Sequence, residues 1–369
     1  MDKTLPEKGG MILKETMMTY VHEQPQVCKN ILKNYETNLE KFKVLVDKKQ
    51  PKNWLILATG SSANAMLSAK YFMEKVANIT IEIQEPFNFV HYEKVKSSID
   101  FVLAVSQSGH SYSTIEAIKK VHAEGKIPTV ALTSRLDSPI TEYADMVIDI
   151  GCGIEKVGFV TKGFTATVLT SMLMGITAGA ALGEINQADA ENEVKKLNRL
   201  IESIPAIIEK VESFYNQHAN ELHAIPRFSF IGYGPTVGTA KEAETKFTET
   251  VRVPSQGFEL EAYMHGPYLE VNKEHGLLFI ETKSQLSERA QKLRNYFLSY
   301  TEHCFTISTE SSDHHEKLLS LEIEVDEYTS PLLLAIPFQI LAFRIASGRG
   351  VDLGVRIFDD FDKCLNSKI

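Results

Sequence analysis

Short apolar runs alternate with segments of helical periodicity along the first part of the chain. Five runs have the length and composition of interior strands: 53–60, 79–84, 100–106, 127–134 and 144–151. Helical patterns lie between several of them, for example at 64–76 and 113–125. This alternation of strand and helix with short turns predicts a parallel sheet covered by helices on both faces.

The same pattern restarts in the second half of the chain. A strand-type run at 228–235 is followed by a helix from Thr236 to about Arg252. Further strand-type runs and a final apolar helix follow at 276–283, 304–310, 321–327 and 331–350. Two successive units of similar size predict an α/β fold made of two doubly wound domains. In such sheets, ligands gather at the carboxyl ends of the strands, near the point where strand order reverses.

The remaining segments suggest helices around these two units. Residues 12–46 are predicted to form two helices broken near Pro25, and residues 186–222 a charged helical connector. Residues 163–183 carry no charge and are long enough to cross a bilayer. They hold several threonines, serines and glycines but no flanking aromatic or basic anchors, so we expect a buried helix. The predicted organisation is a helical segment (1–48), a first domain (49–185), the connector (186–222) and a second domain (223–369).

Charge and cysteine content narrow the class of protein. The 369-residue chain has a formal net charge of -9 and no basic stripe, which argues against nucleic acid as a partner. Its four cysteines are widely spread, which suggests reduced thiols without disulfides or a zinc site. The polar N-terminus lacks the apolar core of a signal peptide. We therefore expect a cytoplasmic protein that is not embedded in a membrane.

Hydroxyl side chains follow two of the predicted strands. The stretch AVSQSGHSYST (104–114) places Ser106, Gln107, Ser108 and Ser111 between a strand and a helix. Free backbone amides and the positive end of a helix make such a turn an anion site, usually for phosphate. The alternative is a capped turn without a ligand.

A second turn, in LILATGSSANA (55–65), repeats the design with Ser61 and Ser62. Two serine-rich turns from neighbouring strands could therefore close on one phosphate through neutral hydrogen bonds. A third glycine-rich turn, GYGPTVG (232–238), departs from the dinucleotide-binding spacing. A tight turn with Pro235 starting a helix explains that stretch as well.

Candidate acid–base groups lie in the second unit. Glu242, Lys246 and Glu249 fall at positions i, i+4 and i+7 of one helix face. This pattern alone favours an exposed salt-bridge ladder, and the alternative is a lysine and a carboxylate facing a pocket. His265, in the loop YMHGP, titrates near neutral pH and suits proton transfer, although a lone histidine is more often structural. No histidine or cysteine spacing is typical of a metal site, so we assign no metal.

Taken together, these motifs resemble the sugar isomerase (SIS) domain family. The closer likeness is to the isomerase half of glucosamine-6-phosphate synthase and to the fructosamine- and glucosamine-6-phosphate deglycases. It extends from about residue 12 almost to the end, through stretches such as ATGSSANA, SQSGHS, EKVGFVTKGFT, KEAETKFTE and AYMHGP. The family fold implies two tandem SIS domains, each a doubly wound, flavodoxin-like parallel sheet.

The resemblance also implies roles for individual residues. Six would hold the 6-phosphate of a sugar: Ser61, Ser62, Ser106, Gln107, Ser108 and Ser111. Glu249 falls at the family's catalytic carboxylate, Lys246 at a lysine of the same helix, and Glu155 and Thr161 on the segment lining the sugar pocket. His265 matches a histidine that in this family typically reaches into a neighbouring subunit, which implies a homodimer or a larger homo-oligomer with shared active sites.

Departures from the synthase favour a deglycase. The chain starts Met1-Asp2 and enters the first SIS domain within about 50 residues, so we expect no glutaminase domain and no glutamine-derived ammonia. The synthase's lysine-bearing tail is not reproduced, and residues 350–369 look more like those of deglycases. Gly158–Thr161 also differs from the synthase, which implies an altered sugar pocket.

The expected reaction splits a 6-phosphorylated amino acid–sugar conjugate by proton transfer between C1 and C2 and imine hydrolysis. It needs no cofactor. Glu249 and His265 would be the acid–base pair, in either assignment. The alternatives are an aldose–ketose or synthase-like isomerase and a non-catalytic sugar-phosphate sensor.

Overall fold

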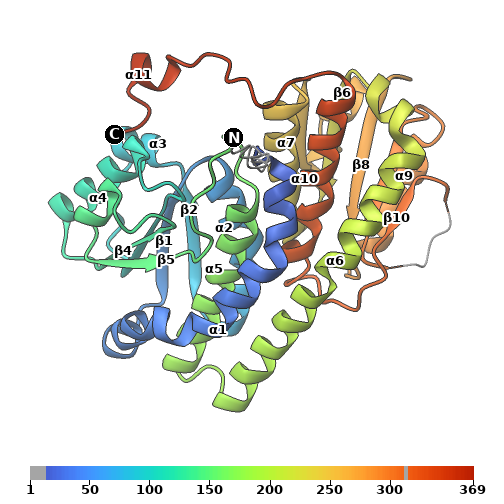
Figure 1. The fold of residues 1–369 in the computed structure, drawn as a ribbon. Helices are drawn as coiled ribbons and strands as arrows, with labels where there is room; N and C mark the ends of the chain where they lie inside the picture. The colour runs from blue at the N-terminus through green and yellow to red at the C-terminus, as the bar shows by residue number, and fades with distance from the viewer. Residues whose placement is uncertain (1–13, 311–314) are drawn as a thin grey trace, which may run out of the picture.

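The chain forms two separate parallel sheets with helices between and around them (Figure 1). This computed structural model describes residues 14–310 and 315–369, so part of the predicted segment 1–48 lies outside the described residues. The first sheet has the order β2-β1-β3-β4-β5 and the second β10-β9-β8-β6-β7. Because β6 to β10 correspond in sequence order to β1 to β5, both sheets share one topology, and the prediction of two doubly wound α/β units is confirmed.

The strands of the first sheet are β1 (Asn53–Ala58), β2 (Thr80–Gln84), β3 (Phe101–Val105), β4 (Thr129–Thr133) and β5 (Met146–Asp149). Those of the second are β6 (Arg227–Gly232), β7 (Ser255–Glu259), β8 (His275–Glu281), β9 (Cys304–Ser308) and β10 (Leu318–Ser320). β3, β4, β8 and β9 are buried along their whole length. Continuous apolar runs of this kind are typical of parallel strands covered on both faces.

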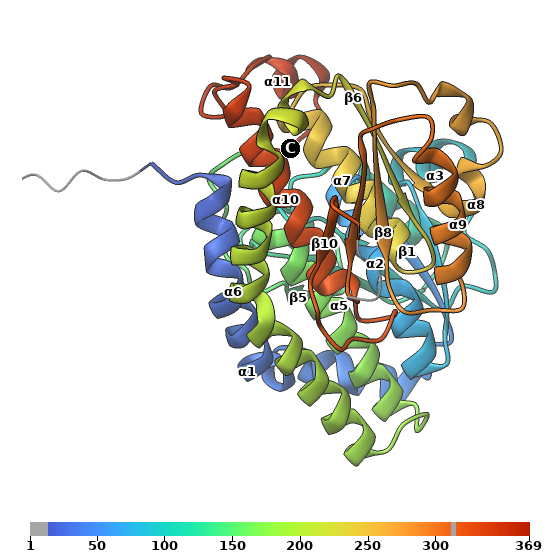
Figure 2. The same cartoon turned by 90° about the vertical axis from the view of Figure 1, so that its right-hand side faces the viewer.

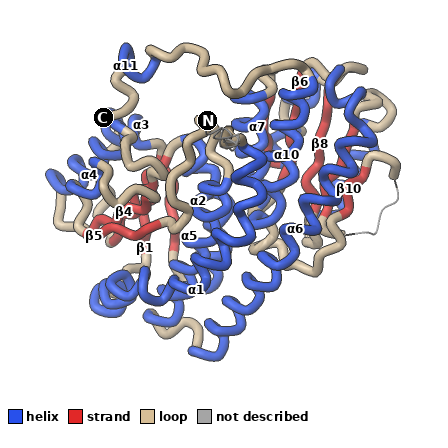
Figure 3. The backbone as a smooth tube through the Cα atoms, viewed as in Figure 1, coloured by secondary structure: helices blue, strands red, loops and turns tan. Residues whose placement is uncertain are grey.

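The helices of the first half are α1 (Met17–Lys49), α2 (Gly60–Ala77), α3 (Pro86–Tyr92), α4 (Tyr112–Glu124) and α5 (Lys162–Ala181). Those that follow are α6 (Gln187–Ala224), α7 (Thr236–Thr250), α8 (Leu260–Tyr263), α9 (Ser287–Phe297), α10 (Pro331–Gly348) and α11 (Phe361–Leu365). Single 3₁₀ turns lie at Pro139–Glu142 and Pro267–Glu270. Figure 3 shows the central helices, in blue, separating the two groups of red strands.

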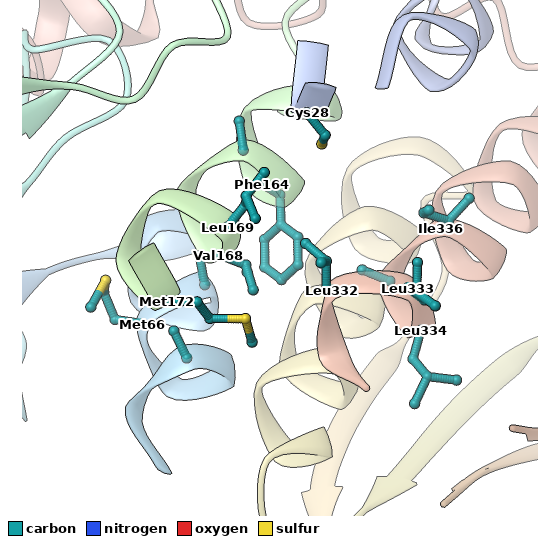
Figure 4. Close-up of a cluster of buried hydrophobic side chains, with 14 of the residues drawn as sticks. Cys28, Met66, Phe164, Val168, Leu169, Met172, Leu332, Leu333, Leu334 and Ile336 are labelled. Atoms are coloured by element: carbon teal, nitrogen blue, oxygen red, sulfur yellow. The ribbon is translucent and has the colours of Figure 1, made fainter. Parts of the chain in front are cut away.

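A shared core between the sheets joins the two units. α5 packs against α1 and α2, α7 against α2, and α10 against α6 and α7. Figure 2 shows α1, α6 and α10 lying alongside one another. Side chains from α5 and α10, with Cys28 of α1 and Met66 of α2, fill the space between them (Figure 4). α5 and α10 are each long and apolar enough to span a membrane, but both are mostly buried inside the fold, as the prediction for residues 163–183 requires.

The structure corrects three sequence-based expectations. α1 is one continuous helix with Pro25 inside it, not two helices. The strand predicted at 321–327 is wrong, because β10 occupies Leu318–Ser320 instead. β7 was not predicted at all; it is a short strand at the edge of the second sheet.

Gly238 allows α7 to approach α2 very closely. A Cβ at this position would lie 2.5 Å from the backbone nitrogen of Ser68 and 2.6 Å from the carbonyl oxygen of Asn64. Both are backbone atoms, so they cannot rotate away. The contact therefore fixes the distance between the helices that carry most of the polar residues described below.

We expect Gly238→Ala to destabilise the protein by about 2–3 kcal/mol, because the added methyl group must push two helices apart. Chemical denaturation followed by circular dichroism measures the change. Gly158→Ala is the matched control, since nothing lies within 4 Å of a Cβ there. Equal stability of the two variants would contradict this account of the α2–α7 contact.

Candidate functional site

The two serine-rich turns meet at one edge of the first sheet. β1 and β3 are neighbours, and their last residues, Ala58 and Val105, pair in register. The turns that follow, at 59–62 and 106–111, therefore leave the sheet side by side. This is the point where strand order reverses, as we predicted for a ligand site.

The second turn is shaped tightly around Gly109, which has a positive φ of 68°. The Ser106 side chain is almost fully buried and accepts a hydrogen bond from the Gly109 amide at 3.1 Å. Ser111 is the N-cap of α4 but makes no side-chain capping bond. Its hydroxyl instead accepts from Thr114 at 2.9 Å. Hydroxyl groups thus lie around the N-terminus of α4, and such an arrangement can bind an anion.

Ser61 points to a different partner from the one expected. Its hydroxyl donates to the Glu242 carboxylate at 3.0 Å, across the boundary between the two units. Asn64, one turn further along α2, donates to the same carboxylate at 3.0 Å and to Thr245 at 3.0 Å. Ser62 lies between them, half-buried, in the first turn of α2. Sequence reasoning missed Asn64, although it follows Ser61 by three residues on one helix face.

Two of the three charges in the α7 row are buried, so the exposed ladder favoured by that stretch alone is wrong. Lys246 is fully buried and Glu242 is 1% exposed, whereas Glu249 is 39% exposed. The Lys246 ammonium lies 2.6 Å from Glu249 Oε2 and 3.6 Å from Glu242 Oε1. One cation is therefore shared unequally by two carboxylates, and the nearer carboxylate is the one that reaches solvent.

Burial and charge act differently on the members of this row. Burial raises the pKa of Glu242 to about 7, although Lys246 and the donors Asn64 and Ser61 oppose the rise. Burial works to lower the pKa of Lys246, but the carboxylates of Glu242 and Glu249 outweigh it and hold that pKa above its ordinary value. Lys246 therefore stays charged, while Glu242 titrates close to neutral pH.

The carboxylate of Glu155, from the preceding loop, lies at the N-terminus of α5. It accepts from the backbone amides of Thr161 at 3.0 Å, Lys162 at 2.9 Å and Gly163 at 3.3 Å. Burial raises its pKa, against the opposing effect of these amides. Thr161 is fully buried, and its carbonyl oxygen accepts from Gln339 of α10 at 2.9 Å. Both residues thus bind protein groups in this structure, and their predicted place in the sugar pocket stays a prediction.

Several of the predicted residues are brought together. Glu155 and Gln107 both lie against Gly163, within 3.2 Å of the place a Cβ would take. Glu155 also acts electrostatically on Lys246. Contacts thus link the serine turn at 106–111 to the start of α5, and the serine turn at 59–62 to the middle of α7 through Ser61 and Glu242.

Comparison with known proteins identifies this arrangement. Residues 49–177 match the family model of the SIS domain. This match covers the first of the two units, which is therefore similar to a SIS domain. Because the second sheet repeats the topology of the first, the molecule consists of two SIS domains in tandem.

Curated relatives align over most of this chain. The isomerizing glutamine–fructose-6-phosphate aminotransferase of Thermus thermophilus is 25% identical over 354 residues, and that of Gloeobacter violaceus is 26% identical over 363 residues. The alignments cover 94% and 95% of this chain but 58% of each relative. The chain thus spans less than three fifths of the length of these relatives.

Solved structures share the fold over nearly the whole chain. A protein of Clostridium difficile, provisionally named a phosphosugar isomerase, has a TM-score of 0.88 and 25% identity, with 95% of this chain and 98% of that chain covered. The C-terminal domain of glucosamine-fructose-6-phosphate aminotransferase from Francisella tularensis has a TM-score of 0.83 and 18% identity, with 93% and 98% covered. The fold of the tandem SIS domains is therefore that of the phosphosugar isomerases.

His265 of the second SIS domain lies apart from the other predicted residues. Its side chain is 74% exposed, and its ion-pair partner is Glu261 at 3.5 Å. Within the described part of the chain, no hydrogen bond or ion pair joins it to Glu249. Its predicted role in a neighbouring subunit stays a prediction.

The C-terminal segment returns from the second SIS domain to the serine turn at 106–111 of the first (Figure 1). Lys368 forms an antiparallel bridge with Ser111, and the Ile369 amide donates to the His110 carbonyl at 3.1 Å. This contact was not predicted, because the segment is irregular in sequence. Among the residues that the structure describes, no three histidine, cysteine or acidic side chains gather in a way that could hold a metal ion.

Proposed function

We propose that this protein is a sugar-phosphate deglycase, which splits a 6-phosphorylated amino acid–sugar conjugate into hexose 6-phosphate and free amine. The observation that supports it most directly is the buried Lys246 paired with the solvent-reaching Glu249, where Lys246 also lies beside Glu242, the partner of Ser61 in the first serine turn. A carboxylate that reaches solvent and is positioned by a buried cation is suited to remove a carbon-bound proton.

The substrate's phosphate would bind at the turn 106–111. Hydroxyl and amide groups at the start of α4 offer neutral hydrogen bonds, and the helix N-terminus favours an anion. The carboxylates of Glu155, Glu242 and Glu249 disfavour binding of the substrate's phosphate on the α7 side. The phosphate therefore sets the direction of the sugar, with C1 and C2 towards Glu249.

The chemistry requires two proton transfers and one water molecule. Glu249 removes a proton from the carbon that bears nitrogen, and the carbonyl oxygen on the neighbouring carbon gains a proton, which gives an enolamine. A proton then adds to that neighbouring carbon while nitrogen loses its proton and forms a C=N bond. Water adds to the imine carbon, and cleavage of the C–N bond releases the amine. No oxidant or reductant is consumed, so the proposed reaction needs no cofactor.

We infer that His265 supplies the second acid–base group from another copy of the chain. Its exposure leaves it available to a partner, and an imidazole can both donate and accept a proton. A carboxylate and an imidazole fit the division between base and acid. We place the reaction in the cytoplasm, which suits the free cysteines, three of them buried.

A second candidate is an aldose–ketose isomerase acting on an unsubstituted sugar phosphate. The same Lys246–Glu249 pair would move a proton between C1 and C2, and no amine would leave. The fold shared with phosphosugar isomerases favours keeping this candidate.

A product assay separates the two. We expect purified protein to release sugar phosphate and lysine in equal amounts from fructoselysine 6-phosphate or from glucoselysine 6-phosphate. An amine on C1 gives glucose 6-phosphate, whereas an amine on C2 gives fructose 6-phosphate, so enzymatic detection of each identifies the sugar carbon. Interconversion of glucose and fructose 6-phosphates without release of lysine would refute the deglycase and support the isomerase.

A further inference from the structure

Glu242 is a buried carboxylate for which the proposed reaction has no direct use. It is 1% exposed and receives hydrogen bonds from Ser61 and Asn64 of the first SIS domain, at 3.0 Å each. Its remaining partner is the Lys246 ammonium, 3.6 Å away on its own helix. A buried carboxylate is costly unless it is fully paired, so its presence between two domains calls for a physical reason.

The packing of α7 against α2 places Glu242 and Glu249 at different depths along α2. Along α7, Gly238 faces Ser68 and Asn64, and Glu242 faces Asn64 and Ser61, so the two helices run in opposite directions. Glu249, almost two turns further on, therefore lies beyond the N-terminus of α2, towards the serine turns. Lys246 lies between the two carboxylates and contacts both.

We propose that Glu242 is a positioning residue that shares the Lys246 ammonium with Glu249 and thereby holds that ammonium in place while Glu249 carries the substrate proton. This inference rests on the proposed function, because it requires Glu249 to act as the base. When Glu249 accepts the substrate proton, it loses its charge and no longer stabilises the ammonium. Glu242 then remains as the carboxylate that keeps Lys246 paired.

The groups around Glu242 are consistent with this role. On its own helix it is acted on by Lys246 and Glu249. α2 contributes only the uncharged donors Ser61 and Asn64 to this contact. Glu155, from the loop before α5, acts on Lys246.

Apolar contacts close the other side of α7. Phe247, next to Lys246 on the helix, packs against Phe230 of β6 at 4.7 Å between ring centroids, and Phe230 packs against Phe338 of α10 at 5.5 Å. Glu242 and Lys246 therefore act on one another in a region of low polarity, whereas Glu249 is partly screened by solvent.

The state of Glu242 should change across neutral pH. Below about pH 7 Glu242 is protonated, and it cannot balance the charge of Lys246 once Glu249 has accepted the substrate proton. Above that pH Glu242 is ionised and keeps the ammonium paired while Glu249 is neutral. The catalytic rate should therefore rise as pH increases through 7.

The decisive experiment is the pH profile of kcat for wild type and Glu242→Gln. We expect the wild-type kcat to rise about tenfold between pH 6 and pH 8, and the variant to stay near the wild-type low-pH value throughout. KM should change less than about twofold, because Glu242 does not touch the substrate. Glu244→Gln, on the exposed side of the same helix, is the control and should keep the wild-type profile.

Other profiles would overturn the proposal. A variant that keeps the rise near pH 7 but is slower at every pH would show a purely structural role for Glu242. A raised KM with unchanged kcat would show a role in substrate binding instead. Thermal unfolding of both proteins in the same buffers establishes that the variant is folded.

Ser61→Ala provides a second test if Glu242→Gln does not fold. The Ser61 hydroxyl helps to lower the pKa of Glu242, so its loss should move the rise in kcat to higher pH by about half a unit. A raised KM and an unmoved profile would instead assign Ser61 to the phosphate and overturn the proposal.

The proposed function can fail separately. A wild-type protein that releases no amine, yet exchanges the C1 or C2 proton of fructose 6-phosphate with deuterated water, would refute the deglycase. The pH dependence of that exchange would then test Glu242 in the same way. The absence of both activities would overturn both proposals.

Discussion

Glu249→Gln should lower kcat by about a thousandfold and leave KM within about threefold of the wild-type value. Glutamine keeps the size and the hydrogen-bonding oxygen of the side chain but cannot accept a carbon-bound proton. Because Glu249 is 39% exposed, its replacement should cost little stability. Release of amine from the conjugate, followed at several substrate concentrations, gives both constants.

The control for this prediction is Glu244→Gln on the same helix. Glu244 pairs with Lys241 at the surface and accepts the Gly257 amide at 2.7 Å, a bond that glutamine can also accept. We expect wild-type kinetics from it. A Glu249→Gln protein that retained more than a tenth of wild-type kcat would exclude Glu249 as the base, and the search would move to Glu155 or to His265 of a second copy.

The parallel sheets could be predicted because their signal is local. Buried parallel strands must be almost wholly apolar, and the turns that leave them concentrate serine and glycine, so runs such as 100–106 stand out in the sequence. Since parallel strands align their carboxyl ends, the meeting of the Ser61 and Ser106 turns followed from topology.

Features that depend on a distant partner could not be predicted. Pro25 normally breaks a helix, but here the neighbouring Gln24 bonds to Gln339 of α10 and to Thr165 of α5, and this packing keeps α1 continuous. β7 is polar and lies at a sheet edge, where burial does not demand an apolar run. Neither feature leaves a periodic signal in its own stretch.

The burial of the α7 charges illustrates the same limit. Residues at i, i+4 and i+7 define one helix face, but their spacing does not say whether that face meets water or another helix. Here the face meets a helix, because Gly238 lets α2 come close enough to cover Glu242 and Lys246. A glycine one turn before a row of charges is the one local hint of such a contact.

The largest stability effect should come from Lys246→Met. Methionine fills a similar volume but leaves the buried Glu242 without its cation, which should cost about 3–5 kcal/mol at pH 8. The loss should be smaller near pH 5, because Glu242 is protonated there in the folded protein. The folded-state pKa of Glu242 already lies above the ordinary value for a glutamate, and loss of Lys246 raises it further. Folded protein then binds more protons than unfolded protein, so stability falls as pH rises.

Urea denaturation at pH 5 and pH 8 measures both values. Lys292→Met, which breaks an exposed pair of the same 2.6 Å length with Glu288, should show no measurable change at either pH. A Lys246→Met protein as stable as that control at pH 8 would mean that Glu242 takes up a proton at little cost, and the shared-cation account of α7 would then be wrong.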